Sequence, residues 1–360
     1  MNSNLDFTQE FPVLNHYTYL NTASSGLLPA SVVAWREQHD KALLQEASMF
    51  RDQHKTHIWE IKETVARFFS TEKERVALVP NFSIGLNILM EGLPKNQKIL
   101  MIEGDYPSVN WPVEFRDFEV CYADLNENLE TNIEAAFAKH RPDVFLCSIV
   151  QYITGIKVDL TFLKELKNQY PETLFIADGT QYFGTERFHF SESAFDIVGA
   201  SSYKWMLGGY GNGFFLLKDG LDKKLFPNTI GFNSADAVFG NRDKINIIGK
   251  MEPGHQDTLN YGTLAQSIEL LEKIGMESVE TYLQEFSSWA HERFRALSLL
   301  PIEISERKNH STIFNIKGDE KLLQHLRKNN IIVSARGKGL RISFHFYNKP
   351  EEIELLLKNI

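Results

Sequence analysis

Short apolar segments alternate with helical segments along most of this 360-residue chain, and no other feature of the sequence restricts the possible folds as strongly. Several of the apolar runs are separated by stretches with a helical period, such as "TNIEAAFAKH" and "LTFLKELKNQY". The runs are "RVALV", "QKILMIE", "FEVCYAD", "DVFLCSIV", "TLFIADG", "FDIVGAS" and "GFFLLK". Strands that are apolar on both faces and joined by helices predict an α/β fold with a largely parallel or mixed sheet covered on both sides.

The pattern changes after "GFFLLKDG". Residues 226–258 have the composition of a loop, and residues 262–297 follow a helical period. "IEISERKNHSTIFNIKG" and "IIVSARGKGLRISFHFYN" are typical of strands in a small α+β domain, which the helix "KPEEIELLLKNI" closes. We therefore expect three parts: an N-terminal segment (1–30), a large domain (31–258), and a linker helix with a small C-terminal domain (259–360).

The charge of the chain limits its partners. At a formal charge of −9, no global positive field exists to attract nucleic acid or an anionic membrane surface. No stretch approaches the roughly 20 apolar residues that span a bilayer, and the first residues lack the pattern of a signal peptide. We therefore expect a cytoplasmic protein without nucleic-acid or membrane partners.

Two polar residues follow predicted strands at their carboxyl ends, where open α/β sheets bind ligands. Asp178 follows "TLFIA", and Lys204 lies just beyond "FDIVGASS". An amine and a carboxylate at one sheet edge are what pyridoxal phosphate requires, since the amine forms a Schiff base with the aldehyde and the carboxylate keeps the ring nitrogen protonated. Ser83, in "VPNFSIGLNILMEGL", follows a strand at a helix start, where a phosphate can bind, although a helix cap is the more ordinary interpretation of such a serine.

These residues stand in motifs of a known family. "ADGTQYFG", followed by "SSYKWMLGGYGNGF", resembles the cofactor core of the class V aminotransferase family of pyridoxal-phosphate enzymes. That family includes cysteine desulfurases, selenocysteine lyases, kynureninases and isopenicillin N epimerase-like proteins. Further segments agree in order along nearly the whole chain, namely "YTYLNTASSGLLP", "VPNFSIGLNIL", "EGDYPSVNWP", "SIVQYITG", "DTLNYGTLAQSIELL" and "LRISFHFYN".

The resemblance implies a fold, a cofactor and a class of reaction. The fold is the type I fold of aspartate aminotransferase, with a mixed, mainly parallel sheet and a small α+β C-terminal domain. The cofactor is pyridoxal 5'-phosphate, and the substrate is a small molecule, an amino acid. The protein is expected to be a homodimer with a shared active site.

The resemblance also implies roles for single residues. Lys204 matches the Schiff-base lysine, Asp178 the partner of the pyridine nitrogen, and Gln181 the residue that contacts the ring hydroxyl. Tyr106 resembles the aromatic residue that stacks on the ring. The positions that match phosphate-binding residues are Phe82 through its backbone, Ser83, Ser201, Tyr203 and, from a second subunit, Thr258.

Two further residues match the substrate side of the family's site. Arg341, in "LRISFHFYN", matches the arginine that holds the substrate carboxylate in bidentate geometry. Taken without the resemblance, an arginine in an alternating strand is more often a charge at the rim. Asn21 lies in the N-terminal segment, which the resemblance places at the border of the substrate pocket.

The chain departs from the family's pattern where the reaction is decided. Cysteine desulfurases carry a nucleophilic cysteine shortly before the substrate arginine, and the matching "IIVSARGKGLR" contains none. Persulfide chemistry of that kind is therefore not expected. We expect instead a transaminase, an epimerase or a lyase. The alternatives are a β-elimination or β-hydrolytic lyase of the selenocysteine-lyase or kynureninase type, and a catalytically silent regulatory protein that binds pyridoxal phosphate.

The cysteines and histidines predict neither a reactive thiol site nor a metal site. Cys121 and Cys147 lie inside apolar runs, which is typical of buried structural thiols. His54 and His57 stand three residues apart, a spacing that can bind metal, but no third ligand accompanies them. We therefore expect no metal site.

Overall fold

The computed structural model describes residues 6–235, 238–307 and 309–360, and its centre is a seven-stranded sheet. The strand order is β2-β8-β7-β6-β5-β3-β4. Every pair from β7 to β4 is parallel, and β8 is antiparallel to both β2 and β7. Each predicted run supplies one strand, so the mixed, mainly parallel sheet is confirmed. The strands are β2 (Val76–Val79), β3 (Lys98–Ile102), β4 (Glu119–Ala123), β5 (Val144–Ser148), β6 (Leu174–Asp178), β7 (Ile197–Ser201) and β8 (Gly213–Leu217).

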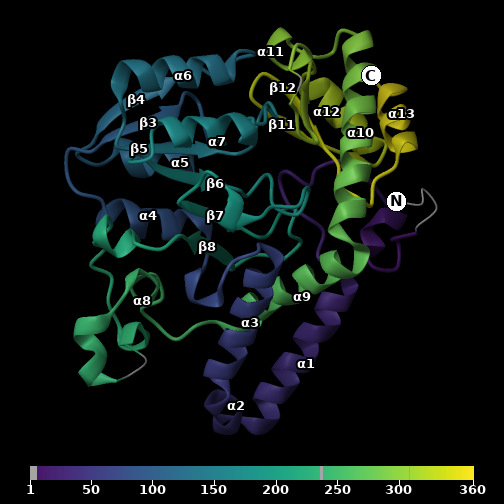
Figure 1. Cartoon of the computed structure of the whole chain (residues 1–360). Helices are drawn as coiled ribbons and strands as arrows, with labels where there is room; N and C mark the ends of the chain where they lie inside the picture. Colours follow the sequence, from purple (N-terminus) through teal and green to yellow (C-terminus); the bar gives the residue numbers. More distant parts are fainter. Residues whose placement is uncertain (1–5, 236–237, 308) are drawn as a thin grey trace.

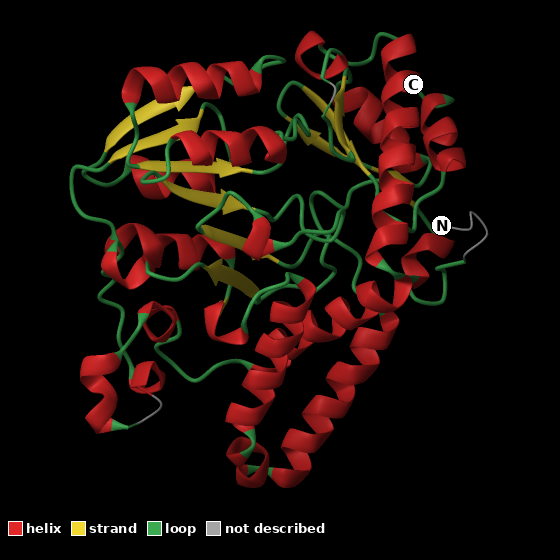
Figure 2. Cartoon of the chain, viewed as in Figure 1, coloured by secondary structure: helices red, strands yellow, loops and turns green. Residues whose placement is uncertain are grey.

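Two hydrophobic cores lie on the two faces of this sheet. In β6, Phe175 and Ala177 enter one core, and Leu174 and Ile176 enter the other. Both faces of the strand are thus buried, which explains why the runs are apolar throughout. Helices α3, α6 and α7 cover the first face, and α4, α5 and α8 cover the second (Figure 2). These helices are α3 (His54–Phe68), α4 (Phe82–Gly92), α5 (Pro107–Glu114), α6 (Leu129–His140), α7 (Leu160–Gln169) and α8 (Ile247–Met251).

Two helices connect the large sheet to the C-terminal part. The stretch predicted as one helix at residues 262–297 is divided at Gly275 into α9 (Thr258–Ile274) and α10 (Met276–Ala296). Gly275 has a φ of +93°, a backbone conformation that favours glycine and cannot continue a helix. The prediction of a single long linker helix is therefore wrong. The apolar period hid the break because α9 and α10 contribute to the same core.

The C-terminal part contains a small antiparallel sheet of the order β11-β12-β9. Residues 302–305 had the alternation of a strand but form the short helix α11 (Ile302–Ser305) after Pro301. A strand would bury Ile302 and Ile304 together on one face, but the helical turn leaves Ile302 exposed and buries Ile304. The other elements are β9 (Ile313–Ile316), α12 (Glu320–Lys328), β11 (Ser334–Arg336), β12 (Gly339–Ser343) and α13 (Pro350–Leu357).

The N-terminal segment joins the C-terminal part before it reaches the large sheet. Strand β1 (Thr18–Tyr19) pairs in parallel with β10 (Ile331–Ile332), and Asn21 forms an isolated bridge with Ser343 of β12. The chain then enters α1 (Ala30–Glu46), which extends away from the sheet and forms a helical arm with α2 (Ser48–Asp52) and α3 (Figure 1). In the described ranges, no helix has both the length and the apolar character needed to cross a membrane.

Candidate active site

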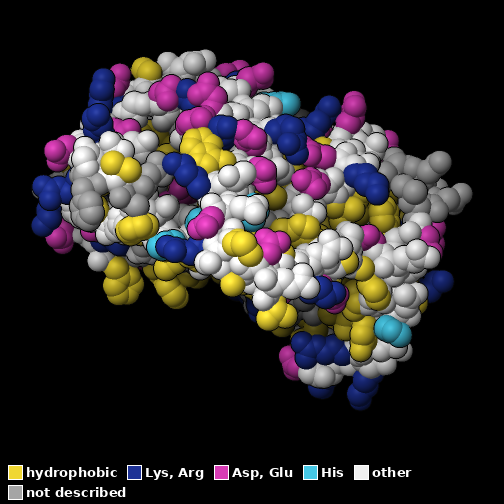
Figure 3. All heavy atoms as spheres, turned by 90° about the horizontal axis from the view of Figure 1, so that it is seen from below, with side chains coloured by type: hydrophobic (Ala, Val, Ile, Leu, Met, Phe, Trp, Pro, Cys, Tyr) yellow, Lys and Arg dark blue, Asp and Glu magenta, His cyan; other side chains and the backbone are white. Residues whose placement is uncertain are grey.

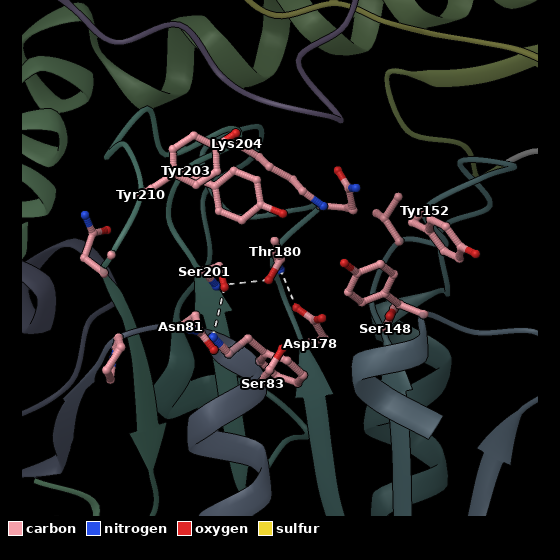
Figure 4. A pocket seen from close by; sticks show the side chains of 17 residues that line it. Asn81, Ser83, Ser148, Tyr152, Asp178, Thr180, Ser201, Tyr203, Lys204 and Tyr210 are labelled. Carbon is pink, nitrogen blue, oxygen red and sulfur yellow. Dashed lines mark hydrogen bonds between the residues drawn. The ribbon is translucent and has the colours of Figure 1, made fainter. Parts of the chain in front are cut away.

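A cavity of about 350 Å³ lies at the carboxyl ends of the parallel strands (Figure 4). Ser148, Asp178 and Ser201, the last residues of β5, β6 and β7, form part of its wall. Neighbouring parallel strands end at the same sheet edge, which is where ligands bind in open α/β folds. Eight of the residues that the sequence singled out line this cavity, namely Phe82, Ser83, Tyr106, Asp178, Gln181, Ser201, Tyr203 and Lys204.

Asp178 is a buried carboxylate at the end of a central strand. Its Cα is paired with Ser148 on one side and Gly199 on the other, so the neighbouring strands fix its position. One carboxylate oxygen accepts a hydrogen bond from the Thr180 amide at 2.8 Å. Burial raises the pKa of Asp178, while the Thr180 hydrogen bonds and the positive charge of Lys204 act in the opposite direction.

Lys204 reaches into the cavity from the side opposite to Asp178 and Ser83 (Figure 4). The side chain is buried, and its amine lies 5.5 Å from the ring centre of Tyr106 and 5.4 Å from that of Tyr203. Burial lowers the pKa of Lys204, and the negative charge of Asp178 opposes this shift only in part. The amine is thereby biased toward its neutral form, which is the nucleophilic one.

The turn that carries Lys204 is held by main-chain contacts on both sides. The Gly26 amide donates to the carbonyl of Tyr203 at 2.8 Å, and a Cβ at Gly26 would overlap the carbonyl oxygen of Lys204. The carbonyl of Trp205 accepts a hydrogen bond from His345 Nε2 at 2.9 Å. These contacts fix the backbone around Lys204, so its amine enters the cavity from a defined position.

The first turn of α4 presents polar groups to the same cavity. Asn81 caps the helix by accepting from the Ile84 amide at 3.0 Å, and the Phe82 amide donates to Ser201 Oγ at 2.9 Å. Ser83 Oγ donates to Ser108 Oγ at 2.8 Å. A helix N-terminus carries partial positive charge, and hydroxyl groups can donate to an anion. This end of the cavity is therefore suited to an anionic group such as a phosphate.

Several cavity residues were not identified from the sequence. Thr180 accepts from the Ser201 amide at 3.0 Å and donates its own amide to Asp178, so it links the ends of β6 and β7. Tyr152 packs edge-on against Tyr106, with ring centres 5.0 Å apart. The only available signal for Thr180 was its place two residues after the carboxylate that ends a predicted strand. Others that were missed are Ser148, Tyr210 and Asn212.

The N-terminal segment borders the cavity without forming its wall. Gln181 Nε2 donates to the carbonyl of Ala23 at 3.1 Å, and Gln181 Oε1 accepts from the Trp205 indole at 2.9 Å. Asn21 is bridged to Ser343, and its buried Oδ1 has no hydrogen-bond partner in the described part of the chain. Asn21 is therefore close to the site but is not among the residues that line it.

Arg341 also lies behind the cavity wall. Its Nη1 donates to the carbonyl of Tyr152 at 2.7 Å and its Nη2 to Ser24 Oγ at 2.6 Å. Only 2% of the residue is exposed, Nε has no hydrogen-bond partner, and no carboxylate of the described residues pairs with the guanidinium group. Burial lowers the pKa of Arg341 to about 10, and the charge of Arg336 adds to the effect. A buried cation without a counter-ion is costly, so the site is suited to an anion.

Thr258 does not reach this cavity within one chain. It is the first residue of α9, and its Oγ1 lies 3.0 Å from His39 Nε2 of α1. Asn260, two residues further on, contacts the cavity segment at Gly211, where a Cβ would lie 3.1 Å from its Nδ2. The start of α9 is therefore adjacent to the cavity, while Thr258 points to the helical arm.

Comparisons with known proteins point to one family. The family model described as aminotransferase class-V matches residues 18–356. An uncharacterised aminotransferase of Bacillus subtilis, YcbU, is 22% identical and covers 98% of this chain and 96% of its own length. The isopenicillin N epimerase of Amycolatopsis lactamdurans is 24% identical, with coverages of 94% and 93%.

Solved structures share the fold over nearly the whole chain. A mutant of the enzyme C-DES with glycine covalently linked to its pyridoxal-phosphate cofactor superposes with a TM-score of 0.85 at 18% identity, covering 99% of both chains. The same enzyme, described as a cystine C-S lyase in complex with its product cysteine persulfide, gives a TM-score of 0.84 at 18% identity. It covers 97% of this chain and 98% of its own.

Proposed function

This chain belongs to the aminotransferase class-V family of pyridoxal-phosphate-dependent enzymes, and on that premise we propose that it acts on an α-amino acid through Lys204, Asp178 and Arg341. The observation that carries the proposal is the buried amine of Lys204 in one cavity with the buried carboxylate of Asp178. No other pair of groups in that wall combines a nucleophile with a fixed negative charge, as far as the described residues go.

The residues of the cavity fit pyridoxal phosphate group by group. Lys204 supplies an amine for the aldehyde, and Asp178 a carboxylate for the ring nitrogen. Ser83, in the first turn of α4, and Ser201, at the end of β7 beside that turn, supply hydroxyl groups for the phosphate. Gln181 is assigned to the ring hydroxyl, since its amide nitrogen donates one hydrogen bond to Ala23 and retains a second hydrogen.

We assign the proton transfers to Lys204. When bound, pyridoxal phosphate supplies an aldehyde that condenses with amines and a ring that accepts electrons from the substrate. Lys204 then takes and returns the proton of the substrate's α-carbon, because burial lowers the pKa of its amine toward the range in which it is an effective base. Asp178, held at the end of β6, would supply the negative charge that keeps a ring nitrogen protonated.

Arg341 is the proposed receptor of the substrate carboxylate. Two of its nitrogens already donate to Tyr152 and Ser24, and these bonds hold the guanidinium plane behind the cavity wall. The missing counter-charge would arrive with the substrate. Because Arg341 does not line the cavity in this structure, the proposal requires a small shift of the Tyr152 or Ser24 segment when substrate binds.

A lyase that cleaves the substrate side chain is the second candidate. The observation that favours it over a persulfide-forming desulfurase concerns the only two cysteines of the chain, Cys121 and Cys147, which are free and buried. Burial raises the pKa of both thiols, most strongly at Cys147, so neither is ready to receive sulfur. An elimination releases the side chain directly and needs no cysteine on the enzyme.

The predicted homodimer and cytoplasmic location belong to the same proposal. Support for a dimer comes from the start of α9, which lies beside the cavity, and from exposed apolar residues of the helical arm such as Leu44, which is 83% exposed. Figure 3 shows hydrophobic side chains on the face seen from below. A partner subunit that covered such residues would gain the free energy of apolar burial.

The test is a set of spectra on purified holoenzyme. Wild type is expected to carry a visible chromophore that borohydride fixes at Lys204, and Lys204→Ala is expected to carry none that can be fixed. In Arg341→Gln, the amino acid concentration that half-changes the spectrum should rise roughly ten- to hundredfold, as expected for one lost charged hydrogen-bond pair of about 1.5–3 kcal/mol.

The matched control is Arg67→Gln, which removes an exposed arginine paired with Glu272 far from the cavity and should leave the titration unchanged. Product analysis then separates an exchanged amino group, an inverted α-carbon and a released side chain. If no amino acid changes the spectrum of a loaded wild-type enzyme, the silent regulatory alternative replaces the proposal.

A further inference from the structure

The hairpin that carries Arg341 carries a second arginine on the same face. In the β11–β12 pair, Ser334 stands opposite Arg341 and Arg336 opposite Gly339. Directly paired residues share a face, and so do residues two apart, which makes Arg336 and Arg341 diagonal neighbours. Such neighbours are about 7–8 Å apart along the backbone, within the combined reach of two long side chains.

The tip of this hairpin rests on the loop that supplies a cavity residue. A Cβ at Gly337 would lie 2.8 Å from Ile153 Cγ2, so the tip touches the residue next to Tyr152. Arg341 donates to the carbonyl of Tyr152 from the same side. Tyr152 lines the cavity and Arg336 precedes Gly337 in the chain, so Arg336 stands close to this part of the cavity wall.

Arg336 has no anionic partner of its own. In the described part of the chain, the guanidinium group donates one hydrogen bond, at 3.0 Å to the carbonyl of the preceding Ala335, and pairs with no carboxylate. Burial is the main cause of the shifted pKa values of Lys204, Arg341 and Tyr152, and the positive charge of Arg336 acts on all three. It adds to the lowering of the pKa at Lys204 and Arg341 and opposes the rise of the pKa at Tyr152, which agrees with a guanidinium close to the three groups. Two guanidinium groups thus stand together without a counter-charge.

The carboxylates of the site lie elsewhere and are engaged. Asp178 accepts from Thr180 at the sheet edge. Asp105 accepts from the amide and hydroxyl of Ser148 and from the Tyr106 amide, all within 2.6–2.7 Å. The sheet side of the site is therefore negative and the hairpin side positive, in a chain whose total formal charge is −9. A neutral amino acid brings one carboxylate to the two guanidinium groups, whereas an acidic one brings two anionic groups.

We infer that the substrate is an amino acid with an anionic side chain, whose α-carboxylate binds Arg341 and whose second anionic group binds Arg336. This inference rests on the proposed function and names its substrate class. The second group is a carboxylate or a comparable oxyacid such as a sulfinate, since a guanidinium fork binds the paired oxygens of either. Arg336 is exposed, so it selects among substrates rather than driving binding alone.

The first experiment compares acids with their amides on the holoenzyme. Spectral titrations with L-aspartate against L-asparagine, and L-glutamate against L-glutamine, measure the preference for a charged side chain; L-cysteine sulfinate tests the oxyacid. We expect wild type to bind one of the acids at least about tenfold more tightly than its amide, which corresponds to roughly 1.4 kcal/mol. Arg336→Gln should abolish this ratio, and Arg336→Lys should restore part of it.

Lys338→Gln is the matched control. Lys338 carries the same charge two residues further along the same hairpin, and it does not contribute to the shifted pKa values of the cavity residues. The acid-to-amide ratio should survive in this variant. If the acid-to-amide ratio falls equally in Lys338→Gln and Arg336→Gln, the preference comes from the summed positive charge of the hairpin. That result would overturn the assignment to Arg336.

A second readout does not depend on chemistry at the amine. Succinate and glutarate should raise the melting temperature of the holoenzyme more than butyrate does, and Arg336→Gln should remove the difference. If neutral amino acids change the spectrum and acids show no advantage, only this inference fails. If no amino acid changes the spectrum, the proposed function fails with it.

Discussion

Burial acts in opposite directions on the two titratable groups at the centre of the cavity. It lowers the pKa of Lys204 and raises the pKa of Asp178, and their opposite charges compensate only in part. Each group is thus moved toward its neutral form. For a residue that must attack an aldehyde at neutral pH, the free amine is the useful state, because an ammonium has no electron pair to donate.

The first prediction concerns the pH at which Lys204 reacts. Apoprotein mixed with pyridoxal phosphate and reduced with borohydride should be labelled at Lys204 with a pH midpoint below the value of about 10.4 for a free lysine. Peptide mapping measures the midpoint, and a short lysine-containing peptide treated in parallel serves as the reference. Because the charge of Asp178 raises the pKa of Lys204, Asp178→Asn should move the midpoint to still lower pH. A midpoint that moves upward would contradict this electrostatic account.

Single residues of the site could be predicted to different degrees. Asp178 and Lys204 could be located because each follows an apolar strand run, and parallel strands bring their carboxyl ends to one edge. Thr180 and Tyr152 could not, because a polar or aromatic residue in a loop gives no sign of which way it points. The roles assigned to the residues from the family resemblance stay predictions; the structure adds their positions.

At the scale of elements, the turn around Lys204 depends on the absence of a side chain at Gly26. A Cβ there would overlap the Lys204 carbonyl oxygen, which belongs to backbone and cannot rotate away. We expect Gly26→Ala to lower the free energy of unfolding by about 1–3 kcal/mol, as overpacked substitutions do, and to weaken retention of pyridoxal phosphate. Urea denaturation and the chromophore per chain measure the two effects.

Gly254→Ala is the control for this prediction. Gly254 has nothing within 4 Å of its Cβ position and no positive φ, so alanine should be tolerated there without loss of chromophore. Equal losses in the two variants would show that the N-terminal segment does not constrain the lysine turn.

Secondary-structure elements could be predicted where a segment is apolar along its whole length. They could not be predicted where the apolar pattern does not mark the beginning or end of a helix. Six of the seven strands of the large sheet are covered on both faces and are therefore largely apolar, which is why they could be identified. The edge strand β4 is covered less completely, since Glu119 and Tyr122 are exposed. The break between α9 and α10 was missed because the apolar residues continue across Gly275, and a single glycine inside a helical period is ambiguous. Residues 302–305 were predicted as part of a strand but form a helix. A single helical turn has too few residues to show a helical period in the sequence.

At the scale of the whole molecule, one ion pair ties the large sheet to the C-terminal part. Arg307 donates to both carboxylate oxygens of Glu130 on α6, at 2.7 and 2.9 Å, and to the carbonyls of Glu127 and Lys157. Burial by itself would raise the pKa of Glu130, but the hydrogen bonds and charge of Arg307 outweigh it and lower that pKa.

The lowered pKa of Glu130 determines how the stability of the fold depends on pH. A carboxylate with a lower pKa in the folded than in the unfolded state stabilises the fold above its unfolded pKa of about 4.3, and this contribution is lost as the pH falls through the folded pKa. We therefore expect Glu130→Gln to cost about 1–3 kcal/mol at pH 7 and progressively less below pH about 4. Urea unfolding at several pH values measures the difference.

The comparison variant is Glu272→Gln, which breaks the exposed pair with Arg67. That pair lies in solvent, so its loss should cost less than about 1 kcal/mol at any pH. A Glu130→Gln penalty that did not shrink at low pH would mean that packing rather than charge connects the two parts.

A shared active site predicts complementation between defective subunits. If Thr258 serves the site of a partner, Lys204→Ala and Thr258→Val chains should each bind pyridoxal phosphate poorly, while their mixed dimers contain one site with both residues. Unfolding and refolding the two together should then restore a Lys204-linked chromophore in part of the chains. A monomer in sedimentation analysis, or a mixture no better than its components, would contradict the shared site.

The pairing of β1 with β10 also sets an order of events during synthesis. The segment that presses on the Lys204 turn is anchored to Ile331 and Ser343, which lie more than 300 residues further along the chain and are translated correspondingly later. A nascent chain can form the large sheet early, but its first strand has no partner until the C-terminal part has left the ribosome. Non-local pairings of this kind are made late and slowly. Cofactor loading in the final geometry therefore has to wait until β10 and β12 have been made, and chains truncated before β10 should be unable to complete it.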